Sequence, residues 1–164
     1  MPIYMKYGSL EGEVTETGHD KWLSCDSASF SVGRSTSVEV GSGQEKRHRD
    51  QPTVSDMQIS RTYDKASPLL FNEAVVGKPQ KVVIHFLEPA DGPDAPPNVY
   101  LEYELRNCLI SSYSVGGGGG GATESLSINF TAININYTAY DKEDTPSTTR
   151  GAFDLVTAKQ SKWS

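Results

Sequence analysis

The sequence has few of the residues that build metal centres or covalent catalytic sites. Its 164 residues include two cysteines and three histidines, and none of them forms a Cys-x-x-Cys pair or a His-Glu-x-x-His motif. No serine stands in a Gly-x-Ser-x-Gly elbow, and the glycine run at 116–121 lacks the Lys-Ser/Thr and the following helix of a phosphate loop. The sequence therefore predicts no catalytic residue, no cofactor site and no metal site.

Long apolar runs and an excess of positive charge are missing as well. No stretch approaches the ~20 apolar residues that span a bilayer, and Met1–Tyr7 lacks the apolar segment of a signal peptide. The formal net charge is −6, from 15 basic and 21 acidic residues. An acidic chain is a poor partner for nucleic acid. We therefore expect a protein that is made in the cytoplasm, does not insert into a membrane and does not bind nucleic acid.

Cys25 and Cys108 both lie in segments with the composition of β-strands. Without an export signal, two reduced and buried thiols are the simplest interpretation, and a disulfide between them is the alternative. A thiol paired with His19 or His85 would be the minimum site of a cysteine-dependent hydrolase. Burial in a strand raises the pKa of a thiol and makes it inert, and His85 is more typical of a hydrogen-bonded wall residue.

Alternation of apolar and polar residues predicts a mainly β protein. Met57, Ile59 and Arg61 share one face of a predicted strand, and 82–87 is apolar on both faces, which is typical of a central strand. Glu102 and Glu104 lie on the face opposite the apolar residues of 99–105, where a polar outer surface is favoured over an acid–base pair. The other alternating segments are 3–7, 28–32 and 126–130.

The segment 109–130 predicts a β-hairpin with an unusual tip. Strand-like residues at 109–114 lead into six glycines, Gly116–Gly121, and a second alternating strand follows. Glycine samples both halves of φ/ψ space, so we expect an oversized and flexible tip. The apolar phase then shifts by one residue between Phe130 and Ile133, which predicts a β-bulge that bends the strand at the corner of a barrel or sandwich.

One helix is predicted at about 67–77. Ser67 suits the N-cap and Pro68 the first helical position, and Gly77 marks the end. An apolar stripe at helical spacing is expected to pack on the sheet; it comprises Leu70, Phe71, Ala74 and Val75. The predicted fold is a compact antiparallel β-barrel or sandwich with one short helix and long loops, in a single domain over residues 1–164.

Four blocks of this sequence occur in the same order in a known family. They are 110–130 with its glycine turn, Ile59–Leu70, a weaker block from Gly12 to Gly33, and Gly151–Thr157, where Phe153 stands at a position at which a tryptophan is expected. In these blocks the chain resembles the Hcp family, the tube (haemolysin-coregulated) protein of bacterial type VI secretion systems.

The resemblance implies a fold similar to that of phage tail-tube proteins and a structural, non-enzymatic role. It implies a homo-hexameric ring, stacked into a tube that a contractile sheath drives from a baseplate out of the cell. The implied partners are the VgrG spike at the tip and small effector proteins in the lumen. It also implies a protein made in the bacterial cytoplasm and secreted to the medium or to a target cell.

Two loops are candidates for contacts between subunits in such an assembly. The polar loop Gly41–Pro52 contains a basic cluster that is more typical of a solvated loop tip than of a phosphate site, and an exposed strand edge beside it or beside the glycine tip must be covered or paired. The predicted ring or stacking residues are Lys46, Arg47, His48, Arg49, Gly116 and Gly121.

A secreted, lectin-like β-sandwich that binds a sugar is the alternative from another functional class. It would use the strand-rich fold and the aromatic residues Tyr100, Tyr113, Tyr140 and Trp163. The missing signal peptide and the lack of a clustered aromatic platform argue against it. The cysteine-dependent hydrolase ranks below both, because it depends on two thiols and one histidine alone.

Overall fold

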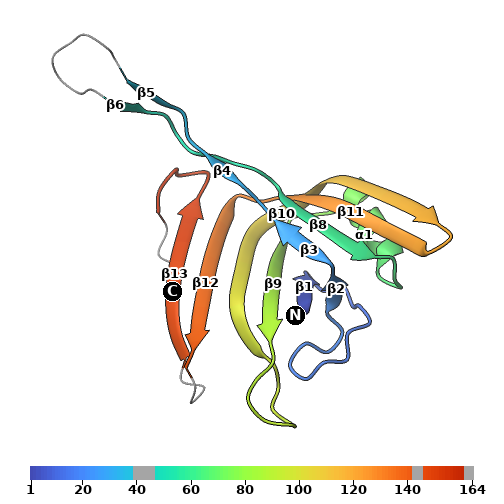
Figure 1. The fold of residues 1–164 in the computed structure, drawn as a ribbon. Helices are drawn as coiled ribbons and strands as arrows, with labels where there is room; N and C mark the ends of the chain where they lie inside the picture. The colour runs from blue at the N-terminus through green and yellow to red at the C-terminus, as the bar shows by residue number, and fades with distance from the viewer. Residues whose placement is uncertain (39–46, 142–145, 161–164) are drawn as a thin grey trace.

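The computed structural model describes residues 1–38, 47–141 and 146–160. In this part of the chain, nine strands form one antiparallel assembly in the order β2-β1-β9-β10-β11-β8-β3, with β12 beside β10 and β13 beside β12 (Figure 1). The strands are β1 (Ile3–Tyr7), β2 (Leu23–Cys25), β3 (Ser27–Ser29), β8 (Met57–Thr62), β9 (Gln80–Glu88), β10 (Asn98–Gly118), β11 (Gly121–Asn129), β12 (Ala132–Tyr140) and β13 (Pro146–Asp154).

The assembly closes into a barrel at Asp26. This residue joins β2 directly to β3, and its backbone N–H donates a hydrogen bond to the Ser60 carbonyl at 2.8 Å. Because β2 pairs with β1 and β3 pairs with β8, the two ends of the strand order meet. The barrel alternative is therefore confirmed over the open sandwich.

Strand β10 is long enough to take part in two sheets. Its first half lies between β9 and β12, and its second half pairs with β11. Strands β11 and β12 follow one another along the same side of β10, separated by residues 130–131. The β-bulge predicted between Phe130 and Ile133 is wrong, because the chain there breaks into two strands. Strand β10 carries the register shifts instead, between Ile110 and Ser112 against β11 and at two places against β9.

The predicted hairpin is present, but the prediction of an oversized tip is wrong. Strands β10 and β11 stay paired out to Gly118 and Gly121, so only Gly119 and Gly120 form the turn. Ladder pairing needs only the backbone N–H and C=O groups, which glycine supplies as well as any other residue. Of the six glycines, only Gly121 has a positive φ, at 113°.

The core lies between the two walls of the barrel and is built largely from alternate residues of the strands. Strand β9 shows the pattern: Val82 and Ile84 are fully buried, whereas Val83 and His85 on its other face are only half-buried. The other strands add further buried side chains to this core, namely Met5, Tyr7, Leu23, Met57, Ile59, Leu105, Cys108, Ile110, Leu126 and Ile128.

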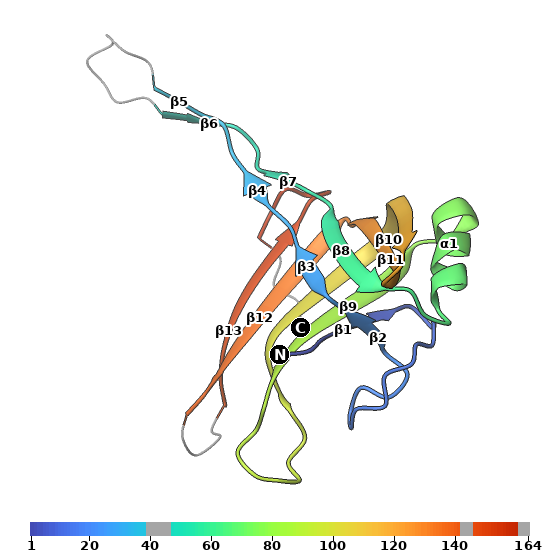
Figure 2. The same ribbon diagram turned by 45° about the vertical axis from the view of Figure 1, so that its right-hand side comes forward.

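Helix α1 (Ser67–Val76) lies outside the barrel, beside the β10–β11 hairpin (Figure 2). Its predicted limits are confirmed to within a residue, but the N-cap is Ala66, and Ser67 is the first helical residue. The prediction that the whole apolar stripe packs in the core is wrong for Phe71 and Val75, which are 53% and 63% exposed. The helix contacts the barrel through one narrow face, so only Ser67 and Leu70 are buried.

A two-stranded arm extends away from the barrel between β3 and β8 (Figures 1 and 2). Its strands pair as β4 with β7 and β5 with β6, so the long loop predicted for Gly41–Pro52 is in part a β-ribbon. Residues 39–46, including Lys46, lie outside the described residues. The arm consists of β4 (Val32–Gly33), β5 (Thr36–Val38), β6 (Arg47–Arg49) and β7 (Thr53–Val54).

Among the described residues, no helix has the length and apolar character required to cross a membrane.

Candidate assembly surfaces

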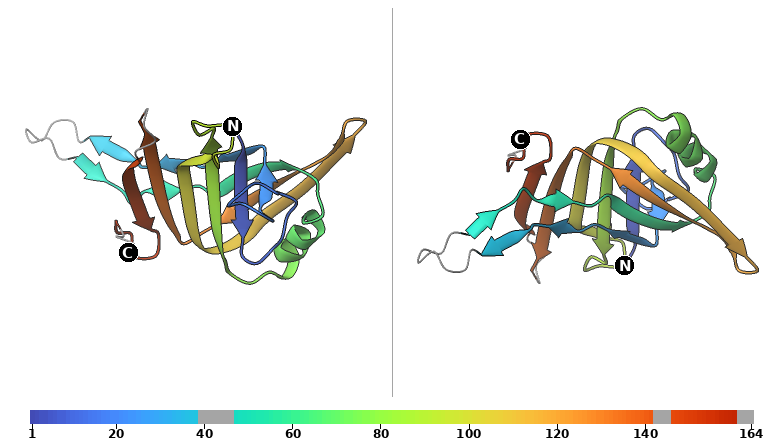
Figure 3. Two further views of the ribbon diagram at one scale, coloured as in Figure 1. Left: turned by 90° about the horizontal axis from the view of Figure 1, so that it is seen from below. Right: turned by 90° about the horizontal axis from the view of Figure 1, so that it is seen from above.

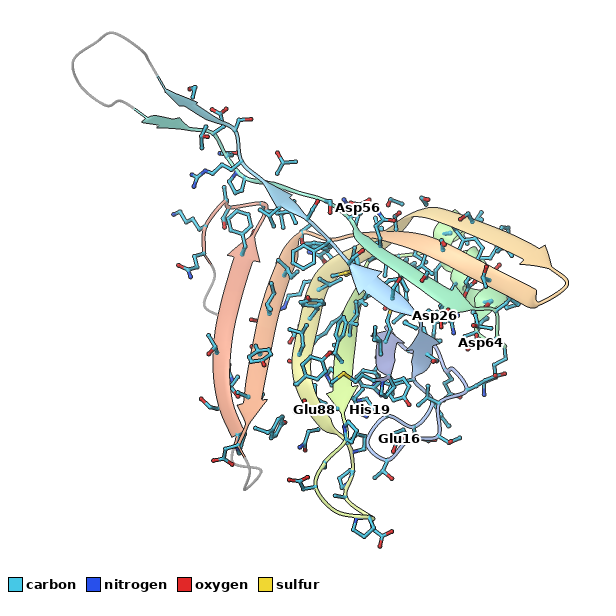
Figure 4. All side chains as sticks on the ribbon, viewed as in Figure 1. Glu16, His19, Asp26, Asp56, Asp64 and Glu88 are labelled. Atoms are coloured by element: carbon cyan, nitrogen blue, oxygen red, sulfur yellow. The ribbon has the colours of Figure 1, made fainter. Side chains whose placement is uncertain are left out.

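A buried charge network lies at the end of the barrel next to α1. The guanidinium of Arg61 on β8 is fully buried and forms ion pairs with Glu124 on β11 and, at 2.5 Å, with Asp64. Asp64, which follows β8, is labelled in Figure 4. Arg61 and Glu124 are directly opposite each other in the β8–β11 register. Arg61 Nε also donates to the Ser24 carbonyl on β2 at 3.0 Å. The network therefore fastens three strands and the segment that leads into α1.

The same network positions the helix and the hairpin. Ser67 Oγ, in the first turn of α1, donates to Glu124 Oε1 at 2.9 Å and accepts from the Asp64 N–H at 2.9 Å. The Tyr113 hydroxyl on β10 donates to the other oxygen of Glu124. Burial and the Glu124 carboxylate raise the pKa of Tyr113. Because buried polar groups are costly when unpaired, this connected set fixes α1 and the hairpin against the barrel.

A second network connects loop 8–22 to the sheet. His19 Nε2 and His85 Nδ1 share a hydrogen bond of 2.8 Å, and His85 Nε2 lies 2.6 Å from Glu102 Oε2. Asn136 on β12 donates to the other Glu102 oxygen at 2.7 Å. Trp22 packs on both imidazoles, with ring centroids 4.7 Å apart in each case. The prediction that His85 is a hydrogen-bonded wall residue is confirmed.

This network contains residues of both catalytic alternatives that the sequence left open. Both ring nitrogens of His85 are occupied, so His85 offers none to a thiol. Both cysteines are free and buried, and burial raises the pKa of Cys25 to about 12 and that of Cys108 to about 12. Glu104 pairs with Lys81 at 2.9 Å rather than with Glu102. In the described part of the chain, no three His, Cys, Asp or Glu side chains gather in a way that could hold a metal ion.

The His19 network predicts that the protein loses stability in mild acid. Burial and the neighbouring His85 lower the pKa of His19, so the folded state favours the neutral imidazole. The unfolded chain then binds a proton first, and stability is complete above the unfolded pKa of ~6.5 and falls as pH drops towards the lowered folded value. We expect urea unfolding between pH 8 and pH 5 to show this loss, and the loss to shrink in His19→Gln. An equal pH dependence in both proteins would contradict this assignment.

The predicted interface residues lie at two separate places. The backbone of Arg47–Arg49 forms β6 in the arm, and Gly116 and Gly121 lie near the end of the β10–β11 hairpin. The arm and the hairpin extend towards opposite ends of the molecule (Figure 3). The structure therefore does not bring the two sets together within one subunit.

An apolar groove at the base of the arm was not expected from the sequence. It has a volume of about 440 Å³ and lies between the arm and strands β12 and β13. Alternating apolar residues at 133 and 135 are the sequence signal, but the second wall comes from residues about 100 positions earlier, which no local pattern connects to it. Its principal lining residues are Phe30, Val32, Pro52, Val54, Ile135 and Phe153.

The three described aromatic residues of the lectin alternative are engaged in contacts within the subunit. The Tyr113 hydroxyl belongs to the Arg61 network, and the Tyr140 hydroxyl donates to the Val99 carbonyl at 3.1 Å. The Tyr100 ring stands edge-on to Phe86 and to Tyr137. Trp163 lies outside the described residues.

In the described part of the chain, these features define a class: a closed β-barrel with one outer helix, a projecting arm and an apolar groove at the base of that arm. The family profile described as "Type VI secretion system effector, Hcp" matches residues 4–137. The chain therefore belongs to the Hcp family of type VI secretion, which confirms the resemblance in the sequence and assigns the chain to the tube proteins of that system.

Solved structures share the fold over nearly the whole chain. One described as a type six secretion system protein is 20% identical, has a TM-score of 0.81, and covers 98% of this chain and 99% of its own. Hcp1 from Salmonella typhimurium is 19% identical, with a TM-score of 0.77 and 97% of each chain covered. A type VI secretion system effector from Yersinia pestis is 18% identical, with a TM-score of 0.69, and covers 93% and 98%. The comparison with curated proteins finds no match.

Proposed function

We propose that this chain is the structural subunit of a type VI secretion tube. Six copies form a ring, and rings stack into a tube that a contractile sheath drives out of the cell. The tube carries the VgrG spike at its tip and small effector proteins in its lumen. The observation that carries this proposal is the family match over residues 4–137, on a fold shared with Hcp1 over 97% of both chains.

The arrangement of surfaces on the subunit supports the proposal of a ring. A ring needs a head-to-tail interface in which two different patches meet and close after a fixed rotation. The β10–β11 hairpin with α1 lies at one end of the molecule, and the arm with β13 lies at the other (Figure 3). One subunit thus presents two different surfaces in different directions. The subunit has no need of a catalytic centre for this role.

The basic charge of the arm supports the proposal that stacked rings contact one another through it. The segment Lys46-Arg47-His48-Arg49 is strongly basic in a chain whose net charge is −6. A basic segment on an arm attracts the acidic surface of a neighbouring copy, and salt screens such exposed charges over a Debye length of ~8–10 Å. Stacking is therefore expected to depend on ionic strength.

Reversing two of these charges should weaken stacking. We expect Arg47→Glu/Arg49→Glu to shorten tubes and to make the remaining tubes more sensitive to salt, because attraction becomes repulsion. Tube length is measured by negative-stain imaging over a series of NaCl concentrations. The control Arg47→Lys/Arg49→Lys keeps the charge and should keep the tubes. Unchanged tube length and salt response in the glutamate variant would exclude this role for the arm.

Export tests the function itself. In the bacterium that produces this chain, the protein should accumulate in the medium of cells whose sheath contracts and stay inside cells whose sheath is locked or absent. Lysis is controlled with a cytoplasmic marker enzyme. Release that is independent of the sheath, or equal retention in both strains, would reject the proposed function.

A further inference from the structure

Helix α1 is more apolar than is normal for a helix on the surface of a single subunit. Between Pro68 and Val76 its only polar residues are Asn72 and Glu73. A surface helix normally carries one apolar stripe, and a helix that is apolar around most of its circumference is normally buried. Within this subunit, α1 buries only Ser67 and Leu70.

The exposed apolar side chains lie on both flanks of the buried face. Leu69 and Val76, seven residues apart, are 42% and 78% exposed, and Phe71 and Val75, four residues apart, are 53% and 63% exposed. Together they expose on the order of 400 Å² of side chain, about half of the ~800 Å² that each partner contributes to a standard protein interface. An exposed apolar area of a few hundred Å² on a single subunit is often functional.

The apolar groove at the base of the arm is a matching acceptor. Val32 at its edge is 60% exposed, so the groove is open to another molecule. Strands β4 and β13 lie on the side of the barrel away from α1 (Figures 2 and 3). The subunit therefore carries an apolar projection on one side and an apolar hollow of about 440 Å³ on the other.

We propose that α1 of one copy docks in the apolar groove of the next copy, between its arm and strands β12 and β13. This proposal rests on the proposed ring and names the surfaces that close it. Donor and acceptor differ, so the contact is head-to-tail and repeats around a ring. The proposed occupant is a second copy, because the chain itself supplies both apolar surfaces and the centre of an interface is more apolar than its rim.

A charge introduced on the docking surface of α1 tests the proposed contact. Val76→Glu should raise the protein concentration at which half of the subunits are assembled by about tenfold or more, because docking would bury an unpaired carboxylate. Val76 is 78% exposed in the single copy, so the thermal unfolding of the monomer should stay the same. Ala95→Glu adds the same charge to the exposed loop between β9 and β10 and should assemble like the parent chain. Assembly of Val76→Glu equal to that of Ala95→Glu would overturn the proposal.

Cross-linking locates the contact and separates it from the ring itself. Copies that carry only Val76→Cys are mixed with copies that carry only Val32→Cys and are treated with a short bis-maleimide; the native thiols are buried. We expect linked dimers in the mixture and none when Val76→Cys is mixed with Ala95→Cys. Rings without the Val76–Val32 link would overturn the docking proposal and leave the proposed function standing. A wild-type chain that forms no rings would overturn both.

Discussion

Replacing Arg61 by methionine is expected to lower the free energy of unfolding by about 3–5 kcal/mol, because it leaves the fully buried Glu124 carboxylate without its charge partner. Methionine keeps most of the side-chain volume, so the loss reports the broken ion pair and hydrogen bonds rather than a cavity. Urea unfolding, followed by tryptophan fluorescence, measures it. The loss should also loosen α1, since Ser67 and Tyr113 bond to the same carboxylate.

Two controls decide what the Arg61 result means. Lys21→Met removes an ion pair of 3.3 Å with Glu11 in which both side chains are more than half exposed, and it should cost less than ~1 kcal/mol. Arg61→Met/Glu124→Gln removes both buried charges and should recover part of the loss. A cost for Arg61→Met as small as that for Lys21→Met would mean that the network does not hold this end of the barrel.

Replacing Ile84 by alanine is expected to lower the free energy of unfolding by about 2–5 kcal/mol, since truncation of a fully buried side chain removes apolar contacts and leaves a cavity. Ile84 lies on β9 opposite Met5 on one side and Tyr103 on the other, so the cavity would open in the middle of the barrel wall. Denaturant unfolding with an unchanged m-value measures the loss.

The neighbouring Val83 is the matched control for the barrel register. It lies on the same strand but on the opposite, half-buried face, so Val83→Ala should cost about 1 kcal/mol or less. A shift of one residue in the pairing of β9 would exchange the two faces. A larger loss from Val83→Ala than from Ile84→Ala would therefore contradict the register of the sheet.

Local patterns in the sequence predict much of the fold. Alternation places Met57, Ile59 and Arg61 on one face, and the structure buries all three. The helix limits follow from Pro68 and Gly77, which restrict the backbone locally. The family follows from the order of four blocks along the chain, and residues 4–137 match its profile.

Features that depend on distant partners could not be predicted in this way. Arg61 lies on an apolar face, but only the pairing of β8 with β11 shows that Glu124 neutralises it. The glycine tip was expected to be flexible because composition does not show that backbone pairing continues to Gly118. The groove needs two walls about 100 residues apart in sequence. Helical spacing alone also does not show that Phe71 and Val75 stay more than half exposed within one subunit.

The mass of the purified protein in solution tests the central claim most directly. Light scattering after size exclusion, with negative-stain images of the same peak, gives both the number of copies and the shape. A tube subunit predicts six times the chain mass of 17.9 kDa and open rings. A single species of 17.9 kDa at high protein concentration would contradict the ring and, with it, the proposed tube.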